Sequence, residues 1–296
     1  MKTNRDPFRS PYLALAFLLP AACMYLTFMI VPLIRTVFSS LFDWGGLGSA
    51  SFVGFSNYLE VFTDSKFFEA AGHNILLIFF LAVIPALVGL FLATLLEMNS
   101  LKSEKLFETV YFIPQVLSLV VVGVVWKWIY HPLYGFLQGM ASLLGSSTEI
   151  PLLGDSRTAL IAVGISGTWV NYGFAMMVFL SGYKRIPEEL YESAAMDGAS
   201  RIRQWWSISL PLLIGEISVV FTYLLISALK VFDLVYVMTR GGPGTSTTVL
   251  SLYVFKNAFQ YNRPSYASAL AVVMSALMVL IAVLPNALRQ GANDEN

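Results

Sequence analysis

The sequence predicts an all-α membrane protein with six transmembrane helices and both termini in the cytoplasm. Its 296 residues are 57% hydrophobic and only 12% charged, whereas a soluble domain carries about a quarter charged residues. Six apolar runs recur, each long enough for the roughly 20 helical residues that cross a bilayer. They cover residues 12–34, 75–96, 109–130, 159–180, 212–232 and 266–287. Lipid is therefore the expected solvent for most of the surface.

The basic residues predict the orientation of these spans. With six spans and the basic leader inside, the inner segments contain Lys2, Arg5, Arg9, Lys102, Lys105, Lys184, Arg185, Arg201, Arg203 and Arg289. The outer segments contain Arg35, Lys66, Arg157, Arg240, Lys256 and Arg263. The inner excess, in segments that are shorter in total, follows the positive-inside rule.

The first run, 12–34, is expected to remain as a span. A cleaved signal peptide is the alternative, but its apolar region is roughly 7–15 residues, and no small-x-small cleavage site ends this longer run. Cys23 lies within the run and is expected to be a buried thiol. A lipoprotein box is disfavoured because Pro20 stands where an aliphatic residue belongs. One cysteine cannot form an internal disulfide.

The connecting segments complete the expected layout. Residues 1–11 form a cytoplasmic amino terminus and 288–296 a cytoplasmic tail, and the main transmembrane domain covers 75–287. Segment 35–74 is external, with a glycine turn at 45–48 and a short helix at 57–62. The glycine- and serine-rich segment 131–158 is expected to be external and irregular.

The inner segment 183–211, between the fourth and fifth spans, contains a short expected helix. Pro187 suits a first helical position, acidic residues follow it in the first turn, and Gly198 suits a left-handed stop. Tyr191, Ala194, Ala195 and Gly198 fall at spacings of three and four, which places them on one face. Such a small face allows another surface to approach closely. An ordinary loop helix folded against its own bundle is the alternative.

A longer motif favours the interpretation that another surface approaches this face. Glu192, then Gly198, then Ile208-Ser209-Leu210-Pro211 follow the pattern Glu-Ala-Ala, three residues, Gly, nine residues, Ile-x-Leu-Pro. This pattern resembles the conserved cytoplasmic loop of binding-protein-dependent ABC importer permeases. Ser193 replaces the usual first alanine. Further segments resemble the sugar-type branch: Phe52–Tyr58, Tyr111–Pro114, Trp126–Trp128, Lys230–Asp233 and Thr239–Pro243.

The resemblance implies a type I ABC importer permease fold in a bacterial-type cell membrane. It implies that the loop contacts an ATPase subunit through Glu192, Ser193, Ala194, Ala195, Asp197 and Gly198. The implied partners are a second homologous permease, two nucleotide-binding ATPase subunits, an extracytoplasmic solute-binding protein and lipid, with no nucleic acid. The chain is expected to be a transport subunit and not an enzyme, with no cofactor of its own and with ATP–Mg on the partner. Accordingly, the sequence contains no GxxxxGK[ST] phosphate loop.

Polar residues within the spans are candidates for the solute path. Trp169 and Asn171 supply the stacking ring and the amide that a sugar site needs, and Thr222, Tyr223 and Ser227 are further candidates. Helix packing is the alternative role for all five. Lys127 and Lys230 suit anchoring at the headgroups, Lys230 and Asp233 could pair on one helix face, and Glu216 could be either a helix partner or a gate contact.

Two other function classes fit six spans less well. A secondary transporter or channel would leave the loop motif without a purpose, and the spans contain no chain of acids for a proton relay. A membrane enzyme is disfavoured because the sequence shows no catalytic motif: the two histidines, His73 and His131, belong to no HExxH motif. The sequence does not distinguish a sugar from a polyol or a glycerol phosphate.

Overall fold

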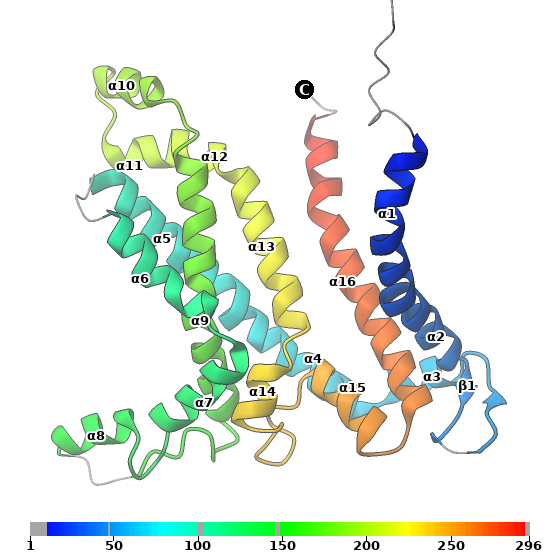
Figure 1. The fold of residues 1–296 in the computed structure, drawn as a ribbon. Coiled ribbons are helices and arrows are strands. Elements are labelled where there is room, and N and C mark those ends of the chain that lie inside the picture. Colours follow the sequence, from blue (N-terminus) through cyan, green and yellow to red (C-terminus); the bar gives the residue numbers. More distant parts are fainter. Residues whose placement is uncertain (1–10, 47, 100–103, 146–148, 294–296) are drawn as a thin grey trace, which may run out of the picture. The chain divides into compact units, whose positions relative to one another are not determined.

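The computed structural model describes residues 11–46, 48–99, 104–145 and 149–293, and it is mainly helical (Figure 1). By its contacts the chain divides into two compact units. The first comprises Met1–Asp64 and Val254–Ser275, and the second Ser65–Tyr253 and Ala276–Asn296. The expected amino-terminal segment before Pro11 and the inner-loop residues 100–103 lie outside the described residues.

The first unit begins with a continuous helical run and a small hairpin. The run consists of α1 Pro11–Tyr25, the π-helical turn η2 Leu26–Ile30 and α2 Val31–Ser39. Strands β1 Phe42–Asp43 and β2 Ser51–Phe52 pair antiparallel, and α3 Ser56–Thr63 follows them. Cys23 is exposed, contrary to the buried thiol expected. The candidate span Phe17–Ser39 that contains it has no buried residue in its most apolar window, as suits a helix solvated by lipid.

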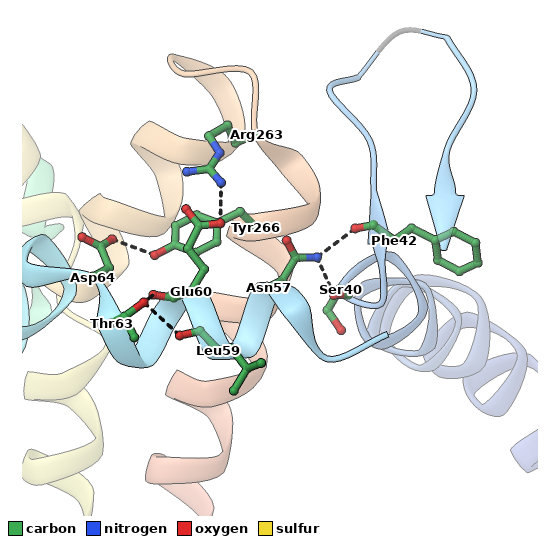
Figure 2. Close-up of polar contacts among 9 residues, drawn as sticks. All are labelled: Ser40, Phe42, Asn57, Leu59, Glu60, Thr63, Asp64, Arg263 and Tyr266. Atoms are coloured by element: carbon green, nitrogen blue, oxygen red, sulfur yellow. Dashed lines mark hydrogen bonds and ion pairs between the residues drawn. The ribbon is translucent and has the colours of Figure 1, made fainter. Parts of the chain in front are cut away.

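Asn57 fixes α3 against the hairpin. Its side-chain nitrogen donates to the carbonyl oxygens of Ser40 and Phe42, each at 2.8 Å (Figure 2). The side chain is 7% exposed, so both hydrogen bonds are largely shielded from water. The helix expected at 57–62 is thus present, with one buried face.

A second polar group joins α3 to the start of α16 Pro264–Asn293. Arg263 pairs with Glu60 at 2.6 Å, and the Tyr266 hydroxyl donates to Asp64 at 2.7 Å (Figure 2). The Arg263 guanidinium also lies 4.4 Å from the centroid of the Tyr266 ring, within the range of a cation–π contact. Two segments far apart in sequence are therefore held together within this unit.

The second unit contains most of the helices. In chain order they are α4 Ser65–Ile78, η3 Phe79–Val83, α5 Ile84–Asn99, α6 Glu104–Val116, α7 Leu119–Ile129, α8 Phe136–Leu143, α9 Ala159–Tyr183, α10 Glu188–Met196, α11 Arg201–Gln204, η4 Trp205–Ser209, α12 Leu210–Leu212, α13 Ile214–Leu229 and α14 Asp233–Met238, with α15 Leu250–Phe259 beginning in this unit. Asn74, which is 1% exposed, donates to the carbonyls of Ala228 and Leu229 and accepts from the Leu250 amide. Its buried amide joins α4, the end of α13 and the start of α15.

The described part of the chain contains four helices long and apolar enough to cross a bilayer. Two further helix pairs pass the same test only if each bent pair is counted as one span. The expectation of a mainly helical chain with several candidate membrane spans is confirmed. The third expected run is not one straight helix, because Ser118 is extended and the axis turns by 97° between Lys105–Val116 and Leu119–Ile129. The fifth turns by 65° before Ile214. Apolar composition continues across both breaks, so hydropathy does not mark them.

Segment 131–158 is also more regular than expected. Helix α8, Phe136–Leu143, lies within it, and the buried Gln138 carboxamide accepts from the Ile150 amide at 3.2 Å. The expectation of an irregular segment was wrong for these eight residues. The glycines on either side of the helix favoured the expectation of an irregular segment, although the stretch between them is apolar.

Glycines allow α9 to pack closely against its neighbours. The core between α5, α9 and α13 contains Ala93, Ala175, Met176 and Phe179. A Cβ added at Gly89 would lie 2.6 Å from the Ala175 Cβ, and one added at Gly173 would lie 2.2 Å from the Tyr111 carbonyl oxygen. Small residues at helix contacts in membranes serve this close approach.

Gly173→Ala is expected to lower the thermal unfolding midpoint of the purified protein in detergent. The new methyl group meets backbone, which cannot rotate away, and overpacking of this kind costs about 1–3 kcal/mol. Gly72→Ala in α4 is the matched control, because nothing lies within 4 Å of its added Cβ. Equal midpoints for the two variants would contradict the close α6–α9 contact.

Candidate functional site

Helix α10 of segment 183–211 ends in a complete Schellman motif. Pro187 is its N-cap and Glu188 its first residue, one position later than expected. At the other end, Gly198 adopts φ +78°. The Gly198 amide donates to the Ala195 carbonyl at 3.0 Å, and the Ala199 amide donates to the Ala194 carbonyl at 2.9 Å. This is the pair of hydrogen bonds that defines the motif.

The six expected ATPase-contact residues lie on or directly after α10. Glu192, Ser193, Ala195, Asp197 and Gly198 are exposed, and Ala194 is half-buried. Within this chain, nothing lies within 4 Å of a Cβ added at Gly198. The segment therefore presents a small, acidic surface that the rest of the described chain does not cover.

One residue of the expected small face points inward instead. The Tyr191 hydroxyl is 2.9 Å from the Ser209 hydroxyl, and Gln204 donates to the carbonyls of Tyr191 and Ala199 at 3.3 Å. Arg201 donates to the Met98 carbonyl on α5 at 3.0 Å. Together these contacts attach the outer helix to the residues beneath it.

A hydrogen-bonded triad joins this segment to two long helices. The Trp205 indole donates to the Tyr183 hydroxyl at 2.8 Å and to the Thr94 hydroxyl at 3.2 Å. Thr94 donates to the Leu90 carbonyl at 2.8 Å, so the Tyr183 hydroxyl donates to Thr94 across their 2.7 Å contact. Every polar hydrogen in this group has an acceptor. Displacement of Trp205 must therefore act on both α5 and α9.

Two ion pairs flank the triad. Arg185 pairs with Glu216 at the start of α13, and Lys184 lies 3.1 Å from Glu108 on α6. The Glu216 side chain is only 13% exposed, so its charge is largely removed from water and needs a partner. Glu216 thus pairs with a residue of the turn after α9 and not with a side chain on a neighbouring helix. Consecutive basic residues thus connect the segment to two different helices.

A cavity of about 490 Å³ lies beneath α10. Its lining includes Glu97, Lys184, Glu188, Tyr191 and Arg201, from four parts of the second unit. Sequence reasoning missed the triad residues and Arg185. The adjacent tryptophans at 205 and 206 were the available signal, but no partner for them is visible in sequence.

A second cavity, of about 380 Å³, lies beside the middle of α9, where Val170 and Asn171 line it. Of the expected solute-path residues, Asn171, Tyr223 and Ser227 line it. Trp169 instead packs its ring against Trp126, with centroids 5.9 Å apart, and neither Trp169 nor Thr222 is in the lining. The lining also includes Gln115, which no sequence pattern marked as a candidate.

Lys230 and Asp233 also line this second cavity, but not as a pair on one helix. Helix α13 ends at Leu229 and α14 begins at Asp233, so a corner separates the two residues. The expected helical i, i+3 pairing was wrong for this reason. Within the described residues, no group of three or more His, Cys, Asp or Glu is placed to hold a metal ion.

Comparison with known proteins gives one consistent result. Residues 86–292 match the family model described as "binding-protein-dependent transport system inner membrane component". The chain is 34% identical to the probable ABC transporter permease protein YurN of Bacillus subtilis, over 93% of this chain and 94% of the relative. It is also 34% identical to the multiple sugar-binding transport system permease protein MsmF of Streptococcus mutans, over 92% and 93%.

Solved structures agree on the fold. A chain of a bacterial ABC transporter involved in alginate import superposes with a TM-score of 0.79 at 24% identity, covering 94% of this chain and 95% of that one. The family match at residues 86–292 includes segment 183–211. The chain therefore belongs to the family of binding-protein-dependent transport system inner membrane components, the multi-pass permease subunits of ABC transporters.

Proposed function

We propose that the chain is the permease subunit of an importer for a sugar or a related small polar solute. It forms the translocation path with a second, homologous permease and couples that path to separate ATPase subunits through segment 183–211. The permease assignment rests on the family. The solute class is supported by the sugar relatives, such as the S. mutans permease at 34% identity.

The observation that carries the coupling role is the construction of segment 183–211. Its outer helix exposes Glu192, Ala195 and Gly198, while its inner residues are hydrogen-bonded to α5 and α9. A force applied to the outer face is therefore transmitted to helices of the membrane domain. A loop helix that only closed a connection would need neither the uncovered small face nor the hydrogen bonds to α5 and α9.

The proposed assembly follows from this role. The α10 end of the second unit faces the cytoplasm, as the basic residues predict, and two ATPase subunits supply ATP–Mg. A solute-binding protein delivers solute on the opposite side. The expected domain layout is kept, with segment 1–11 and tail 288–296 in the cytoplasm, segment 35–74 external and the main domain at 75–287. The chain itself carries no cofactor in this scheme.

Affinity purification of the tagged chain from its native membrane tests the proposal. The purified complex should contain a second, different permease and an ATPase, and proteoliposomes should take up solute only when ATP and a solute-binding protein are both present. Solute uptake that continues without ATP would instead identify a secondary transporter. A competent complex with this permease alone would contradict the heterodimer.

A further inference from the structure

The 380 Å³ cavity has a polar lining that its position between apolar helices does not require. Its polar side chains are Gln115 of α6, Asn171 of α9, Tyr223 and Ser227 of α13, Lys230 directly after α13, and Asp233 at the start of α14. The volume falls within the range of sites for small molecules, about 300–1,000 Å³. All these residues belong to the second unit.

One acceptor in this lining is buried without a donor among the described residues, and a second is held in place beside it. The Gln115 side-chain oxygen is buried and has no hydrogen-bond partner there. Asn171 donates its amide nitrogen to the Leu81 carbonyl at 3.2 Å, which fixes the carboxamide and leaves its oxygen as an acceptor. A buried acceptor without a partner is unfavourable, and a ligand hydroxyl would satisfy it.

The two charged residues of the cavity are not paired with each other. Among the ion pairs of the described residues, none includes Lys230 or Asp233. Their charges cancel within one cavity, so the lining has no net charge to attract an anion or a cation. Asp233 adds two acceptor oxygens, and Lys230 adds donors but no acceptor.

The cavity also has an aromatic wall. The Tyr223 ring packs against Phe174, with centroids 4.5 Å apart, and Phe232 stacks on Tyr236 at 5.2 Å. Both Tyr223 and Phe232 belong to the lining. Held in this way, their rings offer flat apolar surface beside hydroxyl and carboxylate groups, a combination that suits the C–H face and the hydroxyls of a sugar ring.

We propose that this cavity binds a neutral, hydroxyl-rich solute and selects it against anionic sugars. Asp233, Gln115 and Asn171 accept from solute hydroxyls, Lys230 donates to a solute oxygen, and the aromatic wall contacts the ring. An acidic or phosphorylated sugar is disfavoured because the Asp233 carboxylate offsets the attraction of the Lys230 ammonium, so the cavity offers an anion no net charge in return for its lost hydration. The inference rests on the proposed transport function and adds the charge class of the solute.

The single cysteine of the sequence makes a clean labelling experiment possible. In full-length protein with its native partner subunits, Cys23→Ser removes the native thiol, and Ser227→Cys places a reporter in the cavity. The labelling rate by a small methanethiosulfonate is measured in membrane vesicles. The probes are maltose, trehalose and glycerol as neutral solutes, and glucuronate and glucose 6-phosphate as anions.

A neutral probe should slow labelling by about tenfold at about ten times its dissociation constant, as mass action requires, and both anions should have little effect. Asp233→Asn should weaken protection by the neutral probe and allow glucuronate to protect. If Ser227→Cys does not assemble, Leu119→Cys, at an apolar position of the lining, serves as the reporter. Protection by the anions equal to that by the neutral probes, or none by any neutral probe, would overturn the proposal. The measurement uses neither ATP nor uptake, so its failure is distinguishable from failure of the coupling role.

Discussion

Gly198→Asp is expected to abolish ATP-driven solute uptake while the permease still inserts at normal abundance. A residue with a Cβ at φ +78° costs about 1–2 kcal/mol, a modest cost for a helix end on the surface. Nothing in the described chain obstructs the new side chain. The loss therefore arises at the partner surface, where a side chain and a negative charge prevent the ATPase from approaching closely.

Two variants separate the backbone effect from the surface effect. Gly145 at the end of α8 has φ +85° and equally open surroundings, so Gly145→Asp carries a similar conformational cost at a distant place and should keep uptake. Gly198→Asn tests the other component, because asparagine tolerates the left-handed conformation. It should still impair uptake if close approach is what matters. Full uptake by Gly198→Asn would reduce the role of Gly198 to that of a helix stop.

Glu192→Lys is expected to uncouple ATP hydrolysis from transport or to release the ATPase during purification. Glu192 is exposed on α10, so its replacement disturbs no core packing. Reversal of a charge at a complementary interface costs several kcal/mol when like charges meet, and each 1.4 kcal/mol corresponds to about tenfold in affinity. A loss of at least about tenfold in coupled uptake is expected on this basis.

Glu149→Lys provides the matched control for this charge reversal. Glu149 is also exposed but lies in the segment after α8, far along the chain from segment 183–211. The two variants change net charge equally and differ only in place. Equal uptake in both would show that Glu192 has no specific partner.

The exposed residues of segment 183–211 could be predicted from the sequence, but the hydrogen bonds that join the segment to α5 and α9 could not. Gly198 was identifiable because a left-handed helix stop needs a residue without a Cβ, and the spacing from Glu192 to Pro211 is a property of sequence alone. The triad of Trp205, Tyr183 and Thr94 was not, because its members lie up to 111 positions apart. Such contacts depend on how the helices pack.

The membrane cavity illustrates the same limit. Asn171, Tyr223 and Ser227 could be selected as polar residues in apolar runs, whereas Gln115 became a candidate only when its unpaired buried oxygen was seen. Lys230 and Asp233 were misassigned to one helix because the apolar pattern continues through the corner after Leu229. Helix breaks within continuously apolar segments are set by backbone conformation, and hydropathy does not report them.

ATP hydrolysis and solute uptake, measured in the same proteoliposomes for Gly198→Asp and Glu192→Lys, test the coupling role most directly. Each preparation is compared with its control, Gly145→Asp or Glu149→Lys, at equal permease content. We predict that both coupling-segment variants lose uptake, either with the ATPase absent or with hydrolysis continuing unproductively, and that both controls transport normally. Wild-type uptake per ATP hydrolysed in both variants would show that segment 183–211 is an ordinary connector and would contradict the account.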